Sequence, residues 1–188
     1  MPALEALLRD AAQKRSGDLS EYTEAWGAFV RYLASCLEAK RGLHLPSLCK
    51  VGWWTSKKRT GAAEHRPFFQ LTEQFCRSCG MAQEMIKKHC KHPPGELCPL
   101  EDFNFSKASI KFSGKLTKDQ MSSSLRSIVQ QLAESIADRK DVQIVFQDIG
   151  KLSIKGGMDP AFAFSPDFLV LEGAAPTRPG SAAADDAG

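Results

Sequence analysis

One apolar pattern occurs twice in this chain. The first copy consists of Trp26, Phe29, Val30, Leu33 and Leu37. The second copy lies 99 positions later and consists of Leu125, Ile128, Val129, Leu132 and Ile136. At about 3.6 residues per turn, each set forms one continuous stripe along a helix. The chain is therefore expected to contain two long amphipathic helices that arose by duplication.

The duplication continues beyond the helices. Gly42–Leu45 aligns with Asp141–Ile144 at the same displacement, and in both segments alternation of apolar and polar residues replaces the helical period. A further match pairs Phe69–Phe75 with Phe162–Phe168 at a displacement of 93. Because the matches are collinear, we expect a repeated unit in which a long helix is followed by strands.

A Pro93-Pro94-Gly95 run marks the clearest internal boundary. We predict a first domain at residues 1–92, a linker at 93–102, a second domain at 103–173 and a disordered tail at 174–188, which has no large apolar residue. Each domain is expected to close its own small core. The duplicated helices would then pair within one chain.

Local patterns predict the ends of several elements. Met1–Arg15 is expected to form a short charged amphipathic helix, not a signal peptide. Ser20 is the expected N-cap of the first long helix, which Gly42 ends. Residues 103–112 and 168–171 are expected to be extended.

The bulk composition is typical of a folded protein. Of the 188 residues, 43% are hydrophobic and 25% are charged, and the formal charge is only +3. No apolar run approaches the about 20 residues that span a bilayer, so no membrane partner is expected. The positive charge is uneven, because Arg31–Arg66 holds eight Lys or Arg against two acids. Such a patch suits DNA or an acidic protein, or is an ordinary solvated face.

The order helix, helix, strand, turn, strand, basic arm, strand, helix resembles the fold of bacterial HU and integration host factor. A closer resemblance is to the tandem HU-like domains of the coiled-coil domain-containing protein 81 family. It is carried by Trp26, Phe29 and Val30; Gly42-Leu43-His44-Leu45-Pro46; Arg66-Pro67-Phe68-Phe69; Pro94-Gly95-Glu96; and Val142 to Leu152. The resemblance implies an α+β chain of two HU-like domains, each a helix pair with a small antiparallel sheet.

The same resemblance implies a non-enzymatic protein-interaction scaffold. Its expected partners are cytoskeletal proteins at microtubules of the centrosome, basal body or cilium. The chain departs from HU at the arm, because Ser56–Arg66 has no proline at its tip and Lys155–Pro160 leaves almost no second arm. In addition, Cys49 stands where the fold usually has glycine.

The arm and the two tryptophans at its base supply the candidate binding residues, which are Trp53, Trp54, Lys57, Lys58, Arg59 and Arg66. Successive strand residues face opposite sides, so only one of the two tryptophans can enter the core. The other is a candidate contact for a protein partner. The alternative is sequence-independent DNA binding, in which the cations grip phosphates.

Four cysteines form the one metal-like pattern, at Cys76, Cys79, Cys90 and Cys98. A CxxC pair can supply two zinc ligands, although the remaining spacings match no common zinc motif. The alternative is a set of buried thiols in a reducing compartment, with no cofactor. The chain has no GxSxG, P-loop or HExxH motif, so no catalytic residue is predicted.

Overall fold

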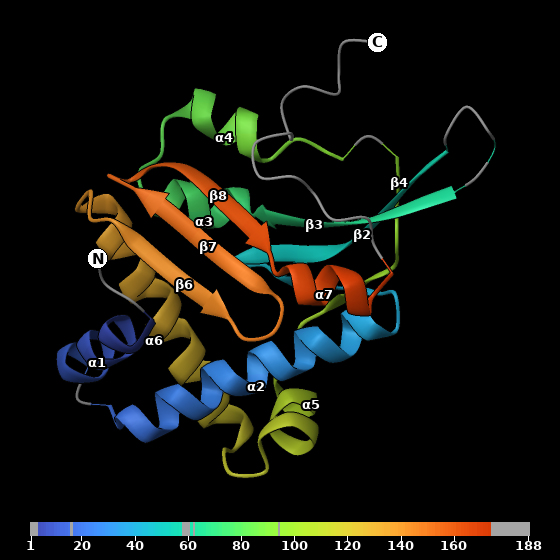
Figure 1. Ribbon diagram of the computed structural model, residues 1–188. Coiled ribbons are helices and arrows are strands. Elements are labelled where there is room, and N and C mark those ends of the chain that lie inside the picture. Colours follow the sequence, from blue (N-terminus) through green and yellow to red (C-terminus); the bar gives the residue numbers. More distant parts are fainter. Residues whose placement is uncertain (1–3, 16, 58–60, 62, 94, 174–188) are drawn as a thin grey trace.

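The computed structural model describes residues 4–15, 17–57, 61, 63–93 and 95–173. The predicted disordered tail lies outside the described residues. The fold combines helices and sheets, so the predicted α+β class is confirmed (Figure 1). None of the helices in the described ranges is long and apolar enough to span a bilayer.

The described part of the chain forms helices and strands in the following order along the sequence. The helices are α1 (Leu4–Lys14), α2 (Leu19–Glu38), α3 (Glu73–Ser78), α4 (Gln83–His89), α5 (Phe105–Lys107), the π-helix η1 (Ala108–Ser113), α6 (Lys118–Ala137) and α7 (Pro166–Leu171). The strands are β1 (Gly42–Leu45), β2 (Cys49–Lys57), β3 (Ala63–Leu71), β4 (Glu96–Leu97), β5 (Leu100–Asp102), β6 (Val142–Phe146), β7 (Gly150–Lys155) and β8 (Met158–Phe164).

The strands form two separate sheets. The first has the order β3-β2-β1-β5, with β4 also paired to β2. The second has the order β6-β7-β8. All pairs are antiparallel except β1 with β5. The two hairpin sheets β1-β2-β3 and β6-β7-β8 therefore have the same connectivity.

The order of long helix, three strands and short helix occurs twice, as α2-β1-β2-β3-α3 and as α6-β6-β7-β8-α7. We call these the first copy and the second copy. In each copy, the N-cap residue of the short helix donates an equivalent backbone hydrogen bond. Thr72 N donates to Leu48 O at 3.0 Å, and Ser165 N donates to Ile149 O at 2.8 Å. Thr72 and Ser165 are the N-caps of α3 and α7, and both acceptors lie in the turn between the first two strands.

The ends of the long helices differ in detail from the predictions. Asp18, not Ser20, is the N-cap of α2, because its side chain accepts from Ser20 N. The helix ends before Gly42, and Lys40 and its counterpart Arg139 both take a positive φ, 56° and 58°. Gly42 instead opens β1, where a Cβ atom would lie 2.7 Å from a β2 carbonyl oxygen. Glycine is needed there for close approach of two strands.

The two copies share one core. α2 packs against α6, and the buried side chains of both copies form one continuous cluster. For example, the rings of Trp26 on α2 and Phe146 on β6 have centroids 5.3 Å apart. The prediction of two separate small cores is therefore wrong. A unit of this size buries a smaller fraction of its surface than a larger domain does, and pairing of the long helices adds to the buried surface.

The segment predicted as a linker, 93–102, belongs largely to the first sheet. β4 pairs with β2, and β5 pairs with β1. Cys98 N donates to Trp53 O, and Gly42 N donates to Pro99 O, each at 2.9 Å. The prediction failed because the backbone N–H and C=O groups of this segment form hydrogen bonds with the edges of β1 and β2, which lie far away in the sequence.

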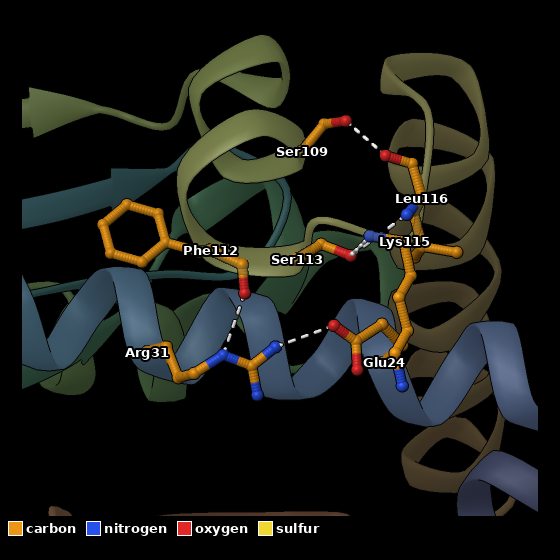
Figure 2. A network of polar contacts seen from close by, with 7 residues as sticks. All are labelled: Glu24, Arg31, Ser109, Phe112, Ser113, Lys115 and Leu116. Carbon is orange, nitrogen blue, oxygen red and sulfur yellow. Dashed lines mark hydrogen bonds and ion pairs between the residues drawn. The ribbon is translucent and has the colours of Figure 1, made fainter.

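Residues 103–112, predicted to be extended, enter a helix instead. Asn104 caps α5, and η1 continues it. The segment is fixed on α2 by Arg31, which donates to Phe112 O at 2.9 Å and pairs with Glu24 at 2.9 Å (Figure 2). Contact with α2 therefore decides the conformation of a segment whose alternating apolar and polar residues resemble a strand.

Residues 168–171 were also predicted to be extended, and they lie in α7. Pro166 occupies the first turn, where its fixed φ suits a helix, and Asp167 adds an acid near the positive helix end. Phe168 is the counterpart of Phe75 in α3, and both rings are buried. The repeat match was therefore the better guide to this segment.

Candidate functional site

The β2–β3 hairpin extends beyond the core (Figure 1). Its strands have nine residues each and pair as far as Lys57 with Ala63. Along β2, Cys49 and Val51–Trp53 are buried, whereas Trp54–Ser56 are only partly buried. We call the part of the hairpin from Trp54 to Arg66 the arm.

The second copy has no equivalent of the arm. Lys155 pairs with Met158 directly across the turn Gly156-Gly157. Both glycines have positive φ values, 57° and 72°, which a tight turn between two strands requires. The prediction that this hairpin leaves almost no arm is confirmed.

Trp53 is a core residue and is not available to a partner. Its side chain is 1% exposed, and its indole N–H donates to Leu37 O at 3.0 Å. Its ring lies against Phe168 of the second copy, with centroids 6.0 Å apart, and Lys40 Nζ lies 4.2 Å from the ring centroid. Trp53 therefore joins the two copies, and its prediction as a binding residue is wrong.

Trp54 faces the other side of the sheet and is only partly buried. Its partner across the hairpin is Arg66, whose guanidinium carbon lies 5.8 Å from the ring centroid. Leu97 of β4 pairs with it on the opposite edge. The aromatic side chain is thus held between two strands at the base of the arm, with one face stacked near a cation.

The remaining arm residues are only partly defined. Arg66 also pairs with Glu64 at 3.4 Å, so part of its charge is neutralised. The backbone of Lys57 belongs to β2, whereas Lys58 and Arg59 lie outside the described residues. Of the predicted binding residues, the structure therefore brings Trp54 and Arg66 together.

Sequence reasoning missed the part that β4 plays at this site. Glu96 and Leu97 pair with Thr55 and Trp54, which makes the base of the arm three strands wide. The preceding Gly95 is needed, since a Cβ atom there would lie 2.4 Å from the Thr55 carbonyl oxygen. The Pro-Gly composition of this stretch indicated a linker and concealed a short strand.

The four cysteines do not gather into a metal site. Burial raises the pKa of Cys76 and of Cys79 to about 12, so both are neutral thiols in this structure. Cys98 Sγ lies 3.1 Å from Trp53 N, at the arm side of the sheet. In the described ranges, no three His, Cys, Asp or Glu side chains are arranged to hold a metal ion. The zinc prediction for these residues and Cys90 is therefore not supported.

The cations of the basic stretch are spread over the molecule and several are already paired. Arg31 binds Glu24 at 2.9 Å, beside η1. Lys40 binds Glu172 at 2.7 Å, beside α7. The uneven charge of the sequence therefore does not become one continuous positive surface through these residues.

A comparison with known families agrees with the fold of the second copy. Residues 99–170 match the family model described as CCDC81 eukaryotic HU domain 2. The match begins just before β5 and ends within α7, so it includes α5, η1, α6 and the whole second sheet. This part of the chain is similar to an HU-like domain.

Proposed function

We propose that this chain is a non-enzymatic protein-interaction scaffold in which two HU-like domains are fused in tandem and pair within one molecule. The match at residues 99–170 supports the HU-like character of the second copy. The common element order, and the equivalent bonds from Thr72 and Ser165, support the same origin for the first copy.

The single arm is the observation that carries the interaction role. It offers a partly exposed aromatic side chain, Trp54, beside the cation Arg66. Aromatic and arginine side chains are the commonest energetic anchors of protein interfaces. A symmetric grip on a duplex, as the resemblance to HU implies, would need an arm from each copy, and the second copy turns at Gly156-Gly157.

In this proposal the partner is a cytoskeletal protein of the centrosome, basal body or ciliary microtubules. That location follows from the resemblance to the coiled-coil domain-containing protein 81 family. The test is to express the tagged chain in ciliated cells and compare it with the double variant Trp54→Ala/Arg66→Ala. We expect the chain at the basal body or cilium, and the variant dispersed.

A matched control for that test is Arg77→Ala, because Arg77 is an exposed cation on α3 that pairs with Glu73 in the same helix. The control should localise like the unchanged chain. Accumulation in the nucleus would contradict the proposal, and so would correct localisation of the arm variant.

The alternative function is sequence-independent DNA binding through the arm and the basic stretch of the first copy. The run Lys57-Lys58-Arg59 at the arm favours it. Binding through phosphates weakens steeply with salt, in proportion to the number of contacts. A duplex that shows no mobility shift with the chain at about 50 mM salt would exclude this function.

A further inference from the structure

A groove of about 670 Å³ runs along α6 on the side of the first sheet's β1–β2 turn. Its floor is apolar and includes Leu45, Phe103, Leu125 and Val129. The rim is polar, with side chains from α3 and α6. A groove of this size lies within the range of sites that bury a ligand or an interface anchor.

The corresponding place in the other half of the molecule is filled. Leu125 on α6 corresponds to Trp26 on α2, and Leu45 at the end of β1 corresponds to Phe146 at the end of β6. The Trp26 and Phe146 rings meet edge to face at 5.3 Å and are both buried. Where two aromatic rings meet in one half, two smaller leucines line the groove in the other. An aromatic side chain is therefore the natural occupant.

The shape of the groove suits a helix. Its α6 lining extends from Ser122 to Ala137, which is about 22 Å at about 1.5 Å per residue. Val129, Ala133 and Ala137 follow one another at intervals of four, so small side chains line one end and permit close approach. A neighbouring face of α6 already packs against the amphipathic helix α1.

The charges at the rim favour an acidic partner. Glu134 is neutralised by Lys14 at 3.0 Å and by Arg15 at 3.4 Å. Arg126 is exposed beside Leu125, and within the described part of the chain it makes no ion pair or hydrogen bond. The charge that is left over at the groove is therefore positive.

We infer that this groove binds an amphipathic helix of a partner protein. The partner packs an aromatic side chain against the apolar lining formed by Leu45, Phe105 and Leu125, and it places an acidic side chain beside Arg126. This is helix-in-groove recognition, in which a few anchors spaced along one helical face provide the affinity. None of the described residues of the arm lines the groove, so this inference holds whether or not the arm binds a partner.

The test uses a phage-displayed library of helical peptides of about 16 residues, each with a fixed central tryptophan, selected on the full chain. The double variant Leu45→Phe/Leu125→Trp copies the residues of the other half and fills the groove. Ala137→Lys is a second block, at an exposed position that leaves the core intact. Arg126→Gln removes the rim charge, and Lys151→Ala, at an exposed position of β7 outside the groove, is the matched control.

We expect selected peptides to bind at least about tenfold more weakly to the double variant and to Ala137→Lys, and with unchanged affinity to Lys151→Ala. Peptides that carry an acid should lose about fivefold on Arg126→Gln. If the double variant does not fold, the affinity of the peptides for Ala137→Lys tests the inference. Equal binding to the blocked variants, or failure to select any groove-dependent peptide, would overturn the inference. Self-association that both blocks abolish would also overturn it, because the occupant would then be a second copy of the chain.

Discussion

Phe69 on β3 and Phe162 on β8 stack face to face, with ring centroids 4.2 Å apart and ring planes 7° from parallel. They hold equivalent positions, because Phe69 pairs with Val51 and Phe162 pairs with Leu152 in matching hairpins. A residue that touches its own counterpart lies close to an axis that relates the two copies. The copies therefore face each other as the subunits of a two-fold symmetric dimer do.

This contact should be measurable as a coupling energy. Phe69→Ala and Phe162→Ala should each lower the free energy of unfolding by about 2 kcal/mol, since both rings are partly buried. The double variant should lose less than the sum, by about 0.5 to 1.5 kcal/mol. Urea unfolding of the four proteins gives these values. Phe105→Ala has no contact with Phe69 in the ring pairs described, and its effect should add to that of Phe69→Ala.

The hairpin bend should tolerate a side chain in one copy only. At Gly150, a Cβ atom would lie 2.5 Å from the Ala163 carbonyl oxygen and 2.7 Å from the Phe162 ring. Gly150→Ala is therefore expected to cost about 2 kcal/mol or more, because backbone must move. Its counterpart Cys49 is buried in a bend that already holds a side chain, so Cys49→Ala should cost less than about 1.5 kcal/mol. Thermal or urea unfolding measures the stability that each variant loses. Equal losses for Gly150→Ala and Cys49→Ala would contradict the conclusion that only the bend at Gly150 lacks room for a side chain.

Asp159 should make stability depend on pH. Lys88 Nζ at 3.0 Å and His89 Nε2 at 3.1 Å contact its carboxylate, and this links α4 of the first copy to β8 of the second. The hydrogen bond from Lys88 is the largest cause that holds the pKa of Asp159 below its usual 3.8. A carboxylate whose pKa is lowered by folding stabilises the fold above its unfolded pKa, and the effect is lost as the pH falls through the folded pKa.

Asp159→Asn tests this contact, because asparagine tolerates the positive φ of 52° at this position. The pair is exposed, so the variant should lose at most about 1 kcal/mol at neutral pH. The difference from the unchanged chain should shrink as the pH falls below 3.8, as followed by urea unfolding. A difference that stays constant down to low pH would show that the carboxylate charge is not the cause.

Helical periodicity was a sufficient guide to the two long helices. All ten residues of the duplicated stripes are buried, from Trp26 to Leu37 in α2 and from Leu125 to Ile136 in α6. A helix with an apolar stripe of this length can remove the stripe from water only by turning that face toward the core. The sequence alone therefore predicts which face is buried. The collinear matches also predicted two equivalent hairpins, but not their alignment. Leu45 pairs with Cys49 and Phe146 pairs with Gly150, so Leu45 corresponds to Phe146 at a displacement of 101, and the predicted alignment of Gly42–Leu45 with Asp141–Ile144 at 99 is wrong.

Short elements were predicted less well, because their conformation depends on distant partners. Residues 103–112 alternate apolar and polar residues like a strand, but contact with α2 makes them helical. Residues 96–102 resembled a linker, but their backbone forms hydrogen bonds with β1 and β2. For 168–171, the match of Phe168 with the helical Phe75 was more informative than the local apolar run.

The candidate site was predicted in part. Alternation along β2 required that one of Trp53 and Trp54 enter the core. Which of the two is buried depends on the contacts of Trp53 with Leu37 and α7, which the sequence does not show. The groove beside α6 left no motif in the sequence. It arises from the difference in size between Leu125 and its counterpart Trp26, which becomes visible only when the two halves are compared.

The central claim is that the two copies fold as one cooperative unit around a shared core. Leu132 lies in the second copy and is 1% exposed, whereas all three tryptophans lie in the first copy. Tryptophan fluorescence therefore reports the first copy when the second is damaged. Ser123→Arg, at an exposed position on the same helix, is the matched control.

The most direct measurement is urea unfolding of Leu132→Arg, followed by tryptophan fluorescence and far-ultraviolet circular dichroism together. A buried, unpaired arginine should cost more than about 4 kcal/mol, so both signals should lose their transition or move together to low urea, while Ser123→Arg unfolds like the unchanged chain. A tryptophan transition at the unchanged midpoint, with helix lost only from the second copy, would contradict the shared core.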